Sequence, residues 1–178
     1  MAETESGDIY LYTYRTGLLS AVGHDLRLSV DRFEVSWEEG EVTGRFWPDS
    51  ISVDGAMKDG QLQEGEPKES DKQKIYRNIQ KDVLKSNRHP EIRFEGGYRE
   101  VETEAGDDKT YEVAGDLEIR GVDEAIEVRL HERDGRFQAD LEIEPTRWGI
   151  KPYSALLGSL KLQDRVTVEL DVSSEKEH

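Results

Sequence analysis

Strict alternation of apolar and polar residues is the feature that most constrains the fold of this chain. In DLRLSV (residues 25–30), Leu26, Leu28 and Val30 share one face and polar residues occupy the other. A period of two places successive side chains on opposite faces of a β-strand. The pattern returns in FEVSW, EVTGRFW, ISV, EIRFE, YEVAGDLEI, IEVRL, FQADLEI and VTVELDV. The sequence therefore predicts an all-β fold with eight or nine half-buried strands.

Short connections between these strands favour a closed, antiparallel up-and-down β-barrel of about eight strands. Turn signals such as Glu39-Gly40, Gly96-Gly97 and Asp134-Gly135 lie between neighbouring strands. Closure removes the exposed edges on which other chains pair. A two-sheet sandwich is the alternative. In a barrel of this size, the interior is either filled by side chains or able to hold one small ligand.

One segment between Ser70 and Asn87 has helical rather than strand periodicity. Its apolar residues recur every three or four positions, namely Ile75, Tyr76, Ile79, Val83 and Leu84. Ser70 and Gln73 fit a capping box, and Pro90 prevents the helix from continuing. We therefore expect one short helix over about residues 71–86.

The stretch before this helix, residues 55–69, is rich in glycine and charge and has few apolar residues. This composition predicts a mobile loop. The strands on either side need each other to form a core, so we expect residues 1–178 to form a single domain.

Charge and composition exclude several classes of function. The chain of 178 residues carries 40 acidic and 24 basic residues, a formal net charge of −16, which opposes binding to nucleic acid. It contains no cysteine, so disulfides and zinc–thiolate sites are excluded. No apolar run predicts a membrane-spanning helix or a signal peptide. We therefore expect a soluble, cytoplasmic protein without stable membrane insertion. Whether a native export signal was removed, and whether two copies form a homodimer, stay open.

Four segments in a fixed order resemble the YceI-like family. They are DVLKSNRHPEIRF (82–94), YEVAGDLEIRGVDEAIEV (111–128), RWGI (147–150) and LQDRVTVELDV (162–172), and the resemblance spans residues 9–173. It implies a lipocalin-like barrel with a helix over one end and a long isoprenoid chain bound in an elongated apolar interior.

The chain also departs from the family pattern near the expected barrel mouth. The usual histidine–serine pair is missing, and Gly17-Leu18-Leu19-Ser20 leads to a lone His24. The helical region is longer than usual, and residues 55–69 look like an insertion. These differences affect the expected ligand more than the expected fold.

His24-Asp25 is the pair that most resembles a metal-binding motif. Consecutive strand residues point to opposite faces, so the two side chains cannot reach one ion without a turn. His89, His131 and His178 lack the short spacings that bring metal ligands together. We therefore predict no metal site. The resemblance leaves open a polar contact between His24 and a ligand head group.

Catalysis has no support from individual residues. The strand carboxylates Glu118, Glu127, Glu142 and Glu169 occupy polar positions, where solvated groups contribute little to acid–base chemistry. No nucleophile elbow, phosphate loop or dinucleotide fingerprint occurs. We predict neither enzymatic activity nor a cofactor. A hydrolase that uses His24 and a nearby carboxylate is the alternative.

The tryptophans have two interpretations. Trp37, Trp47 and Trp148 either line a lipid cavity or plug the barrel ends. Trp148 lies in an apolar stretch without clear periodicity, residues 146–160, which is either a lid over the entrance or an undetected strand.

The leading hypothesis is non-catalytic binding of a long-chain isoprenoid or similar lipid, for carriage or sequestration. Association costs roughly 4–15 kcal/mol, while each buried methylene contributes about 0.8 kcal/mol, so an apolar cavity favours a long hydrocarbon. The predicted ligand-binding residues are His24, Leu26, Leu28, Phe33, Val35, Phe46, Phe94, Leu117, Ile119, Val128, Phe137, Leu141 and Trp148. The rival hypothesis is a ligand-free protein-interaction or stress-response module with a packed barrel.

Overall fold

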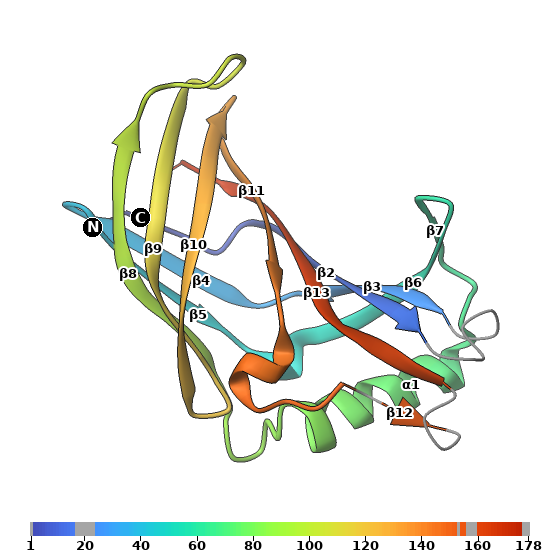
Figure 1. Ribbon diagram of the computed structural model, residues 1–178. Coiled ribbons are helices and arrows are strands. Elements are labelled where there is room, and N and C mark those ends of the chain that lie inside the picture. Colours follow the sequence, from blue (N-terminus) through green and yellow to red (C-terminus); the bar gives the residue numbers. More distant parts are fainter. Residues whose placement is uncertain (1, 17–23, 153, 156–159, 176–178) are drawn as a thin grey trace.

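The computed structural model describes residues 2–16, 24–152, 154–155 and 160–175, which form one strongly curved antiparallel sheet with a helix beside it (Figure 1). The strands are β1 (Ala2–Thr4), β2 (Gly7–Thr16), β3 (Asp25–Val30), β4 (Phe33–Glu38), β5 (Glu41–Phe46), β6 (Ile51–Lys58), β7 (Gln61–Gln63), β8 (Ile92–Val101), β9 (Lys109–Ile119), β10 (Val122–Arg133), β11 (Arg136–Ile143), β12 (Ser154–Ala155) and β13 (Leu160–Ser173). The predicted all-β fold is confirmed. The count of about eight strands is wrong, because the described sheet has thirteen.

The most important strand that the alternation did not reveal is β2. Its inward positions Ile9 and Leu11 alternate with Tyr10, Tyr12 and Tyr14. Because tyrosine is partly apolar, the run shows little contrast between its two faces. β2 lies between β13 and β3, where it completes the wall of the barrel.

The strand order is β1-β4-β5-β8-β9-β10-β11-β13-β2-β3-β6-β7, with β12 beside β13. No ladder among the described strands joins β1 to β7. Chain connections form a corner near the two ends of the sheet, where Asp31 and Arg32 connect β3 to β4 and the 3₁₀ turn η1 (Pro48–Ser50) lies between β5 and β6. Asp31 N donates to Ser50 O and Trp47 N to Arg32 O, both at 3.2 Å. Chain connections therefore complete the barrel at this point.

The predicted helix is present, with different ends. α1 (Glu69–Asn78) continues into a π-helical turn, η2 (Ile79–Val83), whereas the sequence predicted about 71–86. The capping box at Ser70 is wrong, because the N-cap residue is Lys68 and no side chain caps the helix. No helix in the described part of the chain is long and apolar enough to cross a bilayer.

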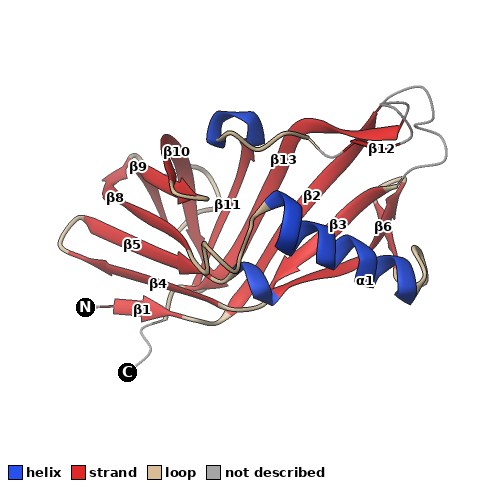
Figure 2. Cartoon of the chain, turned by 90° about the horizontal axis from the view of Figure 1, so that it is seen from below, coloured by secondary structure: helices blue, strands red, loops and turns tan. Residues whose placement is uncertain are grey.

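α1 lies across one end of the barrel, as the view from below shows (Figure 2). Ile75 of α1 and Ile79, the first residue of η2, pack against the main hydrophobic cluster. Gln80 Nε2 in η2 donates to Pro48 O at 2.7 Å, and Tyr76 OH donates to Asp49 O at 3.0 Å. These contacts anchor the helix to the corner of the sheet.

The expected loop over residues 55–69 is largely a hairpin. β6 extends to Lys58 and pairs with β7 around a turn at Asp59 and Gly60. Both turn residues have positive φ, 52° and 76°, which is typical of the tight turns that suit a hairpin. Asp59-Gly60 is therefore a typical hairpin turn. The high charge and glycine content of the segment led instead to the prediction of a loop.

β8 and β9 approach each other closely at two opposed glycines. Gly96 lies directly opposite Gly115 in the ladder. A Cβ on Gly96 would lie 2.8 Å from the Gly115 Cα and would overlap the carbonyl oxygen of Ala114. Glycine at both positions therefore permits a backbone approach that no other residue allows.

Buried apolar residues form two clusters. The main cluster, on β2, β3, β4, β6 and β13, consists of Ile9, Leu26, Leu28, Val30, Phe33, Ile51 and Val172. A smaller cluster consists of Ile119, Trp148 and Ile150 and includes half-buried residues from η2 and β8. The two clusters line different parts of the same hollow sheet.

Candidate functional site: an apolar cavity

The inner face of the sheet and α1 enclose a cavity of about 580 Å³. This volume lies within the range of about 300–1,000 Å³ found for ligand pockets. Its walls are the apolar phases of β2, β3, β4, β5, β6, β8, β9, β10, β11 and β13. The barrel is therefore hollow, whereas the rival hypothesis of a ligand-free module required a packed interior.

Most of the residues predicted from alternation do line this cavity. They are His24, Leu26, Leu28, Val35, Phe46, Phe94, Leu117, Ile119, Val128, Phe137 and Leu141. They come from seven strands and the residue before β3, so strand periodicity alone was sufficient to identify which face turns inward.

Phe33 and Trp148 do not line the cavity. Phe33 is 3% exposed, and as the first residue of β4 after the corner it packs within the main cluster. Trp148 is 1% exposed and lies in a 3₁₀ turn, η3 (Pro145–Trp148). Its Nε1 donates to Leu117 O at 2.8 Å, so the indole anchors this turn to β9. Of the stretch predicted as lid or strand, Tyr153 and residues 156–159 lie outside the described residues.

The helix contributes a wall that the sequence analysis did not assign to the site. Ile75 and Ile79, together with Val83 and Leu84, line the cavity. The apolar stripe at helical spacing was visible in the sequence. What it packed against was not, because no sequence signal relates the helix to the far strands.

Aromatic side chains narrow one end of the barrel. The rings of Trp37 and Phe137 meet edge to face with centroids 5.3 Å apart, and those of Phe137 and Tyr111 are 6.1 Å apart. Tyr98 extends the group, 5.9 Å from Tyr111. Trp37 therefore belongs to an aromatic plug, whereas Trp47 lines the cavity.

Polar side chains gather at the opposite end, where β2 ends and β3 and β13 begin. Thr13 and Arg15 continue the inward phase of β2, and His24 precedes β3 in the same phase as Leu26. The polar residues that line this end are Thr13, Arg15, His24, Lys151, Lys161, Gln163 and Arg165. Except for His24 they were missed, because the search considered only apolar residues on inward faces.

A β-bulge adds to this polar end. The register between β13 and β2 shifts between Leu162 and Val166. Leu162 lies opposite Arg15 and Val166 lies opposite Thr13, so both face inward, whereas the Arg165 guanidinium lies over the Tyr14 ring on the outer face. Three residues of β13 therefore lie opposite one residue of β2 at the bulge, and an irregularity of this kind disrupts the ladder locally.

His24 and Asp25 do not act as a pair. His24 lines the cavity, whereas an Asp25 Oδ1 accepts a hydrogen bond from Arg15 N at 2.8 Å. None of the four strand carboxylates considered in the sequence lines the cavity. Among the described residues, the cavity wall therefore offers His24 no carboxylate partner for acid–base chemistry.

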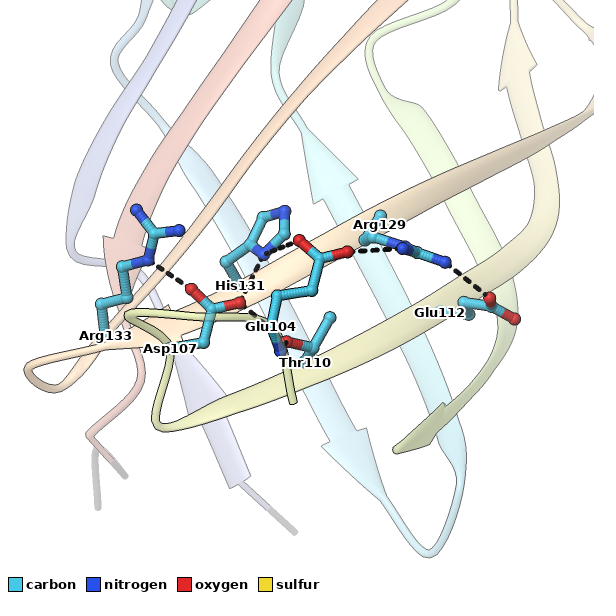
Figure 3. Close-up of polar contacts among 7 residues, drawn as sticks. All are labelled: Glu104, Asp107, Thr110, Glu112, Arg129, His131 and Arg133. Carbon is cyan, nitrogen blue, oxygen red and sulfur yellow. Dashed lines mark hydrogen bonds and ion pairs between the residues drawn. The ribbon is translucent and has the colours of Figure 1, made fainter. Parts of the chain in front are cut away.

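A second polar group lies near the aromatic end and was not found from the sequence (Figure 3). Asp107, in the loop between β8 and β9, has a fully buried side chain. Its Oδ2 accepts from Thr110 Oγ1 at 2.7 Å and lies 2.6 Å from His131 Nδ1, while Arg133 Nε donates to Oδ1. Burial alone would raise the pKa of the carboxyl, but the hydrogen bonds from His131, Thr110 and Arg133 outweigh it and hold this pKa well below its usual range.

This Asp107 network has the residue types of a metal site but a different role. The ligand atoms of Glu104, Asp107 and His131 all lie within 4.8 Å of one another. However, Arg129 Nη1 donates to Glu104 Oε1, and both Asp107 oxygens are already hydrogen-bonded. The carboxylates are neutralised by protein cations, so the group attaches the β8–β9 loop to β10.

A curled antiparallel sheet around an elongated apolar cavity, with a helix across one end, defines the class of lipocalin-like barrels. Within this class, residues 26–174 match the YceI-like domain, and the chain belongs to the YceI-like family. The predicted family and lipocalin-like architecture are thereby confirmed. Comparison with curated proteins gave no match.

Solved structures share the fold at low sequence identity. A polyisoprenoid binding domain from Saccharophagus degradans, implicated in plant cell wall breakdown, is 12% identical with a TM-score of 0.65, and 99% of each chain is covered. BcnA of Burkholderia cenocepacia is 14% identical with a TM-score of 0.60, covering 93% of this chain and 94% of that one. The YCEI protein of Campylobacter jejuni is 14% identical with a TM-score of 0.52, covering 84% and 85%.

Proposed function

We propose that this chain binds a long-chain isoprenoid or similar lipid inside the barrel, without catalysing a reaction, and so carries or sequesters it. The observation that carries the proposal is the apolar cavity of about 580 Å³. The Saccharophagus degradans structure, described as a polyisoprenoid binding domain, supports the same class of ligand. The residues predicted from the sequence that line the cavity are proposed to contact the chain, and Phe33 and Trp148 to support the walls from behind.

The energetics favour a long hydrocarbon over a small metabolite. Association costs about 4–15 kcal/mol, and each buried methylene returns about 0.8 kcal/mol. A ligand therefore needs well over ten buried carbons to bind usefully by apolar contact alone. The aromatic plug at one end and the polar residues at the other favour an orientation in which the tail points towards Phe137.

Extraction of bound lipid tests the proposal directly. Protein purified without detergent is extracted with organic solvent, and the extract is analysed by mass spectrometry. We expect a long-chain species that co-purifies in several preparations. Recovery of none, together with no binding of an added polyprenol, would overturn the proposal.

A pair of tryptophan variants shows whether the lipid occupies the cavity. Leu11→Trp places a large ring at a cavity-lining position of β2, and Val122→Trp places the same ring on an exposed position of β10, where the valine is 38% exposed. We expect a fall of at least about tenfold in polyprenol affinity for the first variant and no change for the second, since a filled cavity excludes the chain. Equal affinities would place the lipid elsewhere.

A further inference from the structure

We infer that the aromatic plug sets an upper limit on the length of the hydrocarbon chain that the barrel encloses. The plug consists of Trp37, Tyr98, Tyr111 and Phe137. The inference rests on the proposed function and deepens it, because it adds selection by chain length and names the residues that impose it.

The inward-facing positions change from aliphatic to aromatic at this end of the barrel. On β9, Val113 lines the cavity, whereas Tyr111, two residues earlier on the same face, does not. On β11, Ala139 and Phe137 share the inward phase, and both line the cavity. Phe137 is therefore the ring that a chain in the cavity touches, and Tyr111 lies behind it with its ring centroid 6.1 Å away.

The rings meet across the interior of the barrel rather than along one strand. β4 and β11 are separated in the sheet by β5, β8, β9 and β10. Nevertheless Trp37 of β4 and Phe137 of β11 are in edge-to-face contact, with centroids 5.3 Å apart. A contact between strands that are so far apart in the sheet spans the interior, so these rings close the cavity at this end.

The inward positions beyond the plug carry charge. Glu100 lies directly opposite Tyr111, and Glu132 lies directly opposite Phe137, and residues paired in this way share a face. Burial raises the pKa of the Tyr111 phenol, and the nearby carboxylates of Glu132 and Glu100 raise it further. A hydrocarbon that extended past the plug would exchange apolar contacts for carboxylates and water. The apolar path therefore ends at the plug.

The Asp107 network ties together the two strands on which the plug rests. Thr110 and His131 lie directly opposite each other on β9 and β10. Asp107 Oδ2 accepts from Thr110 Oγ1 at 2.7 Å and lies 2.6 Å from His131 Nδ1 (Figure 3). Thr110 is the residue before Tyr111, so the network holds this part of the wall from the outer face. A fixed wall of packed rings is what a length limit requires, because packed interiors resist deformation.

A series of prenyl alcohols that differ by one isoprene unit tests the limit. Delipidated protein is titrated with each alcohol in competition with one fluorescent prenyl probe. Each methylene that enters the cavity should raise the affinity roughly fourfold, so the affinity should increase steeply with length until the chain reaches the plug. Longer alcohols must leave their additional carbons outside the cavity, and we expect their affinities to level off.

Two substitutions on β11 should move this break in opposite directions. Phe137→Ala removes the ring at the end of the cavity, so the first alcohol beyond the original break should bind roughly tenfold more tightly. Ala139→Phe places a ring one inward position nearer the polar end, so the alcohol at the original break should bind roughly tenfold more weakly. Far-UV circular dichroism checks the fold of each variant, and Ala139→Phe tests the limit by itself if Phe137→Ala does not fold.

Phe46→Ala is the matched control for the loss of a ring. Phe46 also lines the cavity, at the other end of β5 from Val42, the ladder partner of Trp37. We expect this variant to bind every alcohol more weakly and to keep the break at its original length.

The outcomes separate this inference from the proposed function. An affinity that rises through the whole series without a break would overturn the length limit and leave lipid binding intact. A break that stays at the same length in both β11 variants, or that moves as far in Phe46→Ala, would overturn the role of the plug. No binding of any alcohol would overturn the proposed function itself.

Discussion

The Asp107 network and the polar end of the cavity, around Thr13 and His24, lie at opposite ends of the barrel, and their polar groups differ in how fully they are hydrogen-bonded. In the network, Asp107 receives three side-chain partners, and Thr110 both donates to Asp107 and accepts from Glu104 N at 3.1 Å. At the polar end of the cavity, Thr13 Oγ1 is buried without a partner among the described residues. The first arrangement is complete without a ligand, and the second is not.

This difference separates structural polar groups from recognition groups. A satisfied network stabilises the fold, because its hydrogen bonds replace those that the groups make with water in the unfolded chain. A buried group without a partner destabilises the free protein, and a ligand that pairs with it recovers that free energy. Residue type alone does not distinguish the two ends, since both contain arginine and threonine beside a histidine.

The largest expected effect on stability is that of Asp107→Ala. The substitution leaves His131, Thr110 and Arg133 without their shared acceptor, so we expect the Tm to fall by several degrees. Lipid affinity should not change, because none of these residues lines the cavity. Thermal unfolding followed by circular dichroism gives the Tm, with the exposed Asp123→Ala as control. A Tm equal to that of the control would show that the network has no structural role.

A matched pair of threonine substitutions compares the two ends directly. Thr110→Val should lower the free energy of unfolding by about 1–3 kcal/mol, because Asp107 and Glu104 N lose a partner. Thr13→Val should raise it by up to about 1 kcal/mol in the lipid-free protein, because a buried hydroxyl without a partner is removed. Urea titrations measure both changes. A loss of stability in both variants would contradict the proposed difference between the hydroxyls of Thr110 and Thr13.

The smallest expected effect is on the pH dependence of stability. The pKa of Asp107 is lowered in the folded protein, so the unfolded chain takes up a proton first as the pH falls. The stability that this group contributes is present above its unfolded pKa of about 3.9 and is lost as the pH falls towards the folded value. Urea midpoints at pH 5 and pH 3 should therefore differ less for Asp107→Asn than for the original protein. Equal differences would contradict the assignment of this lowered pKa.

Much of the fold followed from local pattern, and particular residues show where that pattern stopped. Alternation placed Leu26, Leu28 and Phe94 on the inner face, and helical spacing identified the apolar side of α1. It missed β2, whose tyrosines reduce the contrast between faces. It also missed the pairing of Asp107 with His131, which are 24 residues apart in the sequence.

By itself, the sequence determined which side chains share a face, because a strand alternates with a period of two whatever it packs against. It did not determine whether the interior is hollow. That depends on how far the strands curve and where α1 lies. These are contacts between distant segments, so only the tertiary structure decided that an apolar cavity exists and that polar residues line one of its ends.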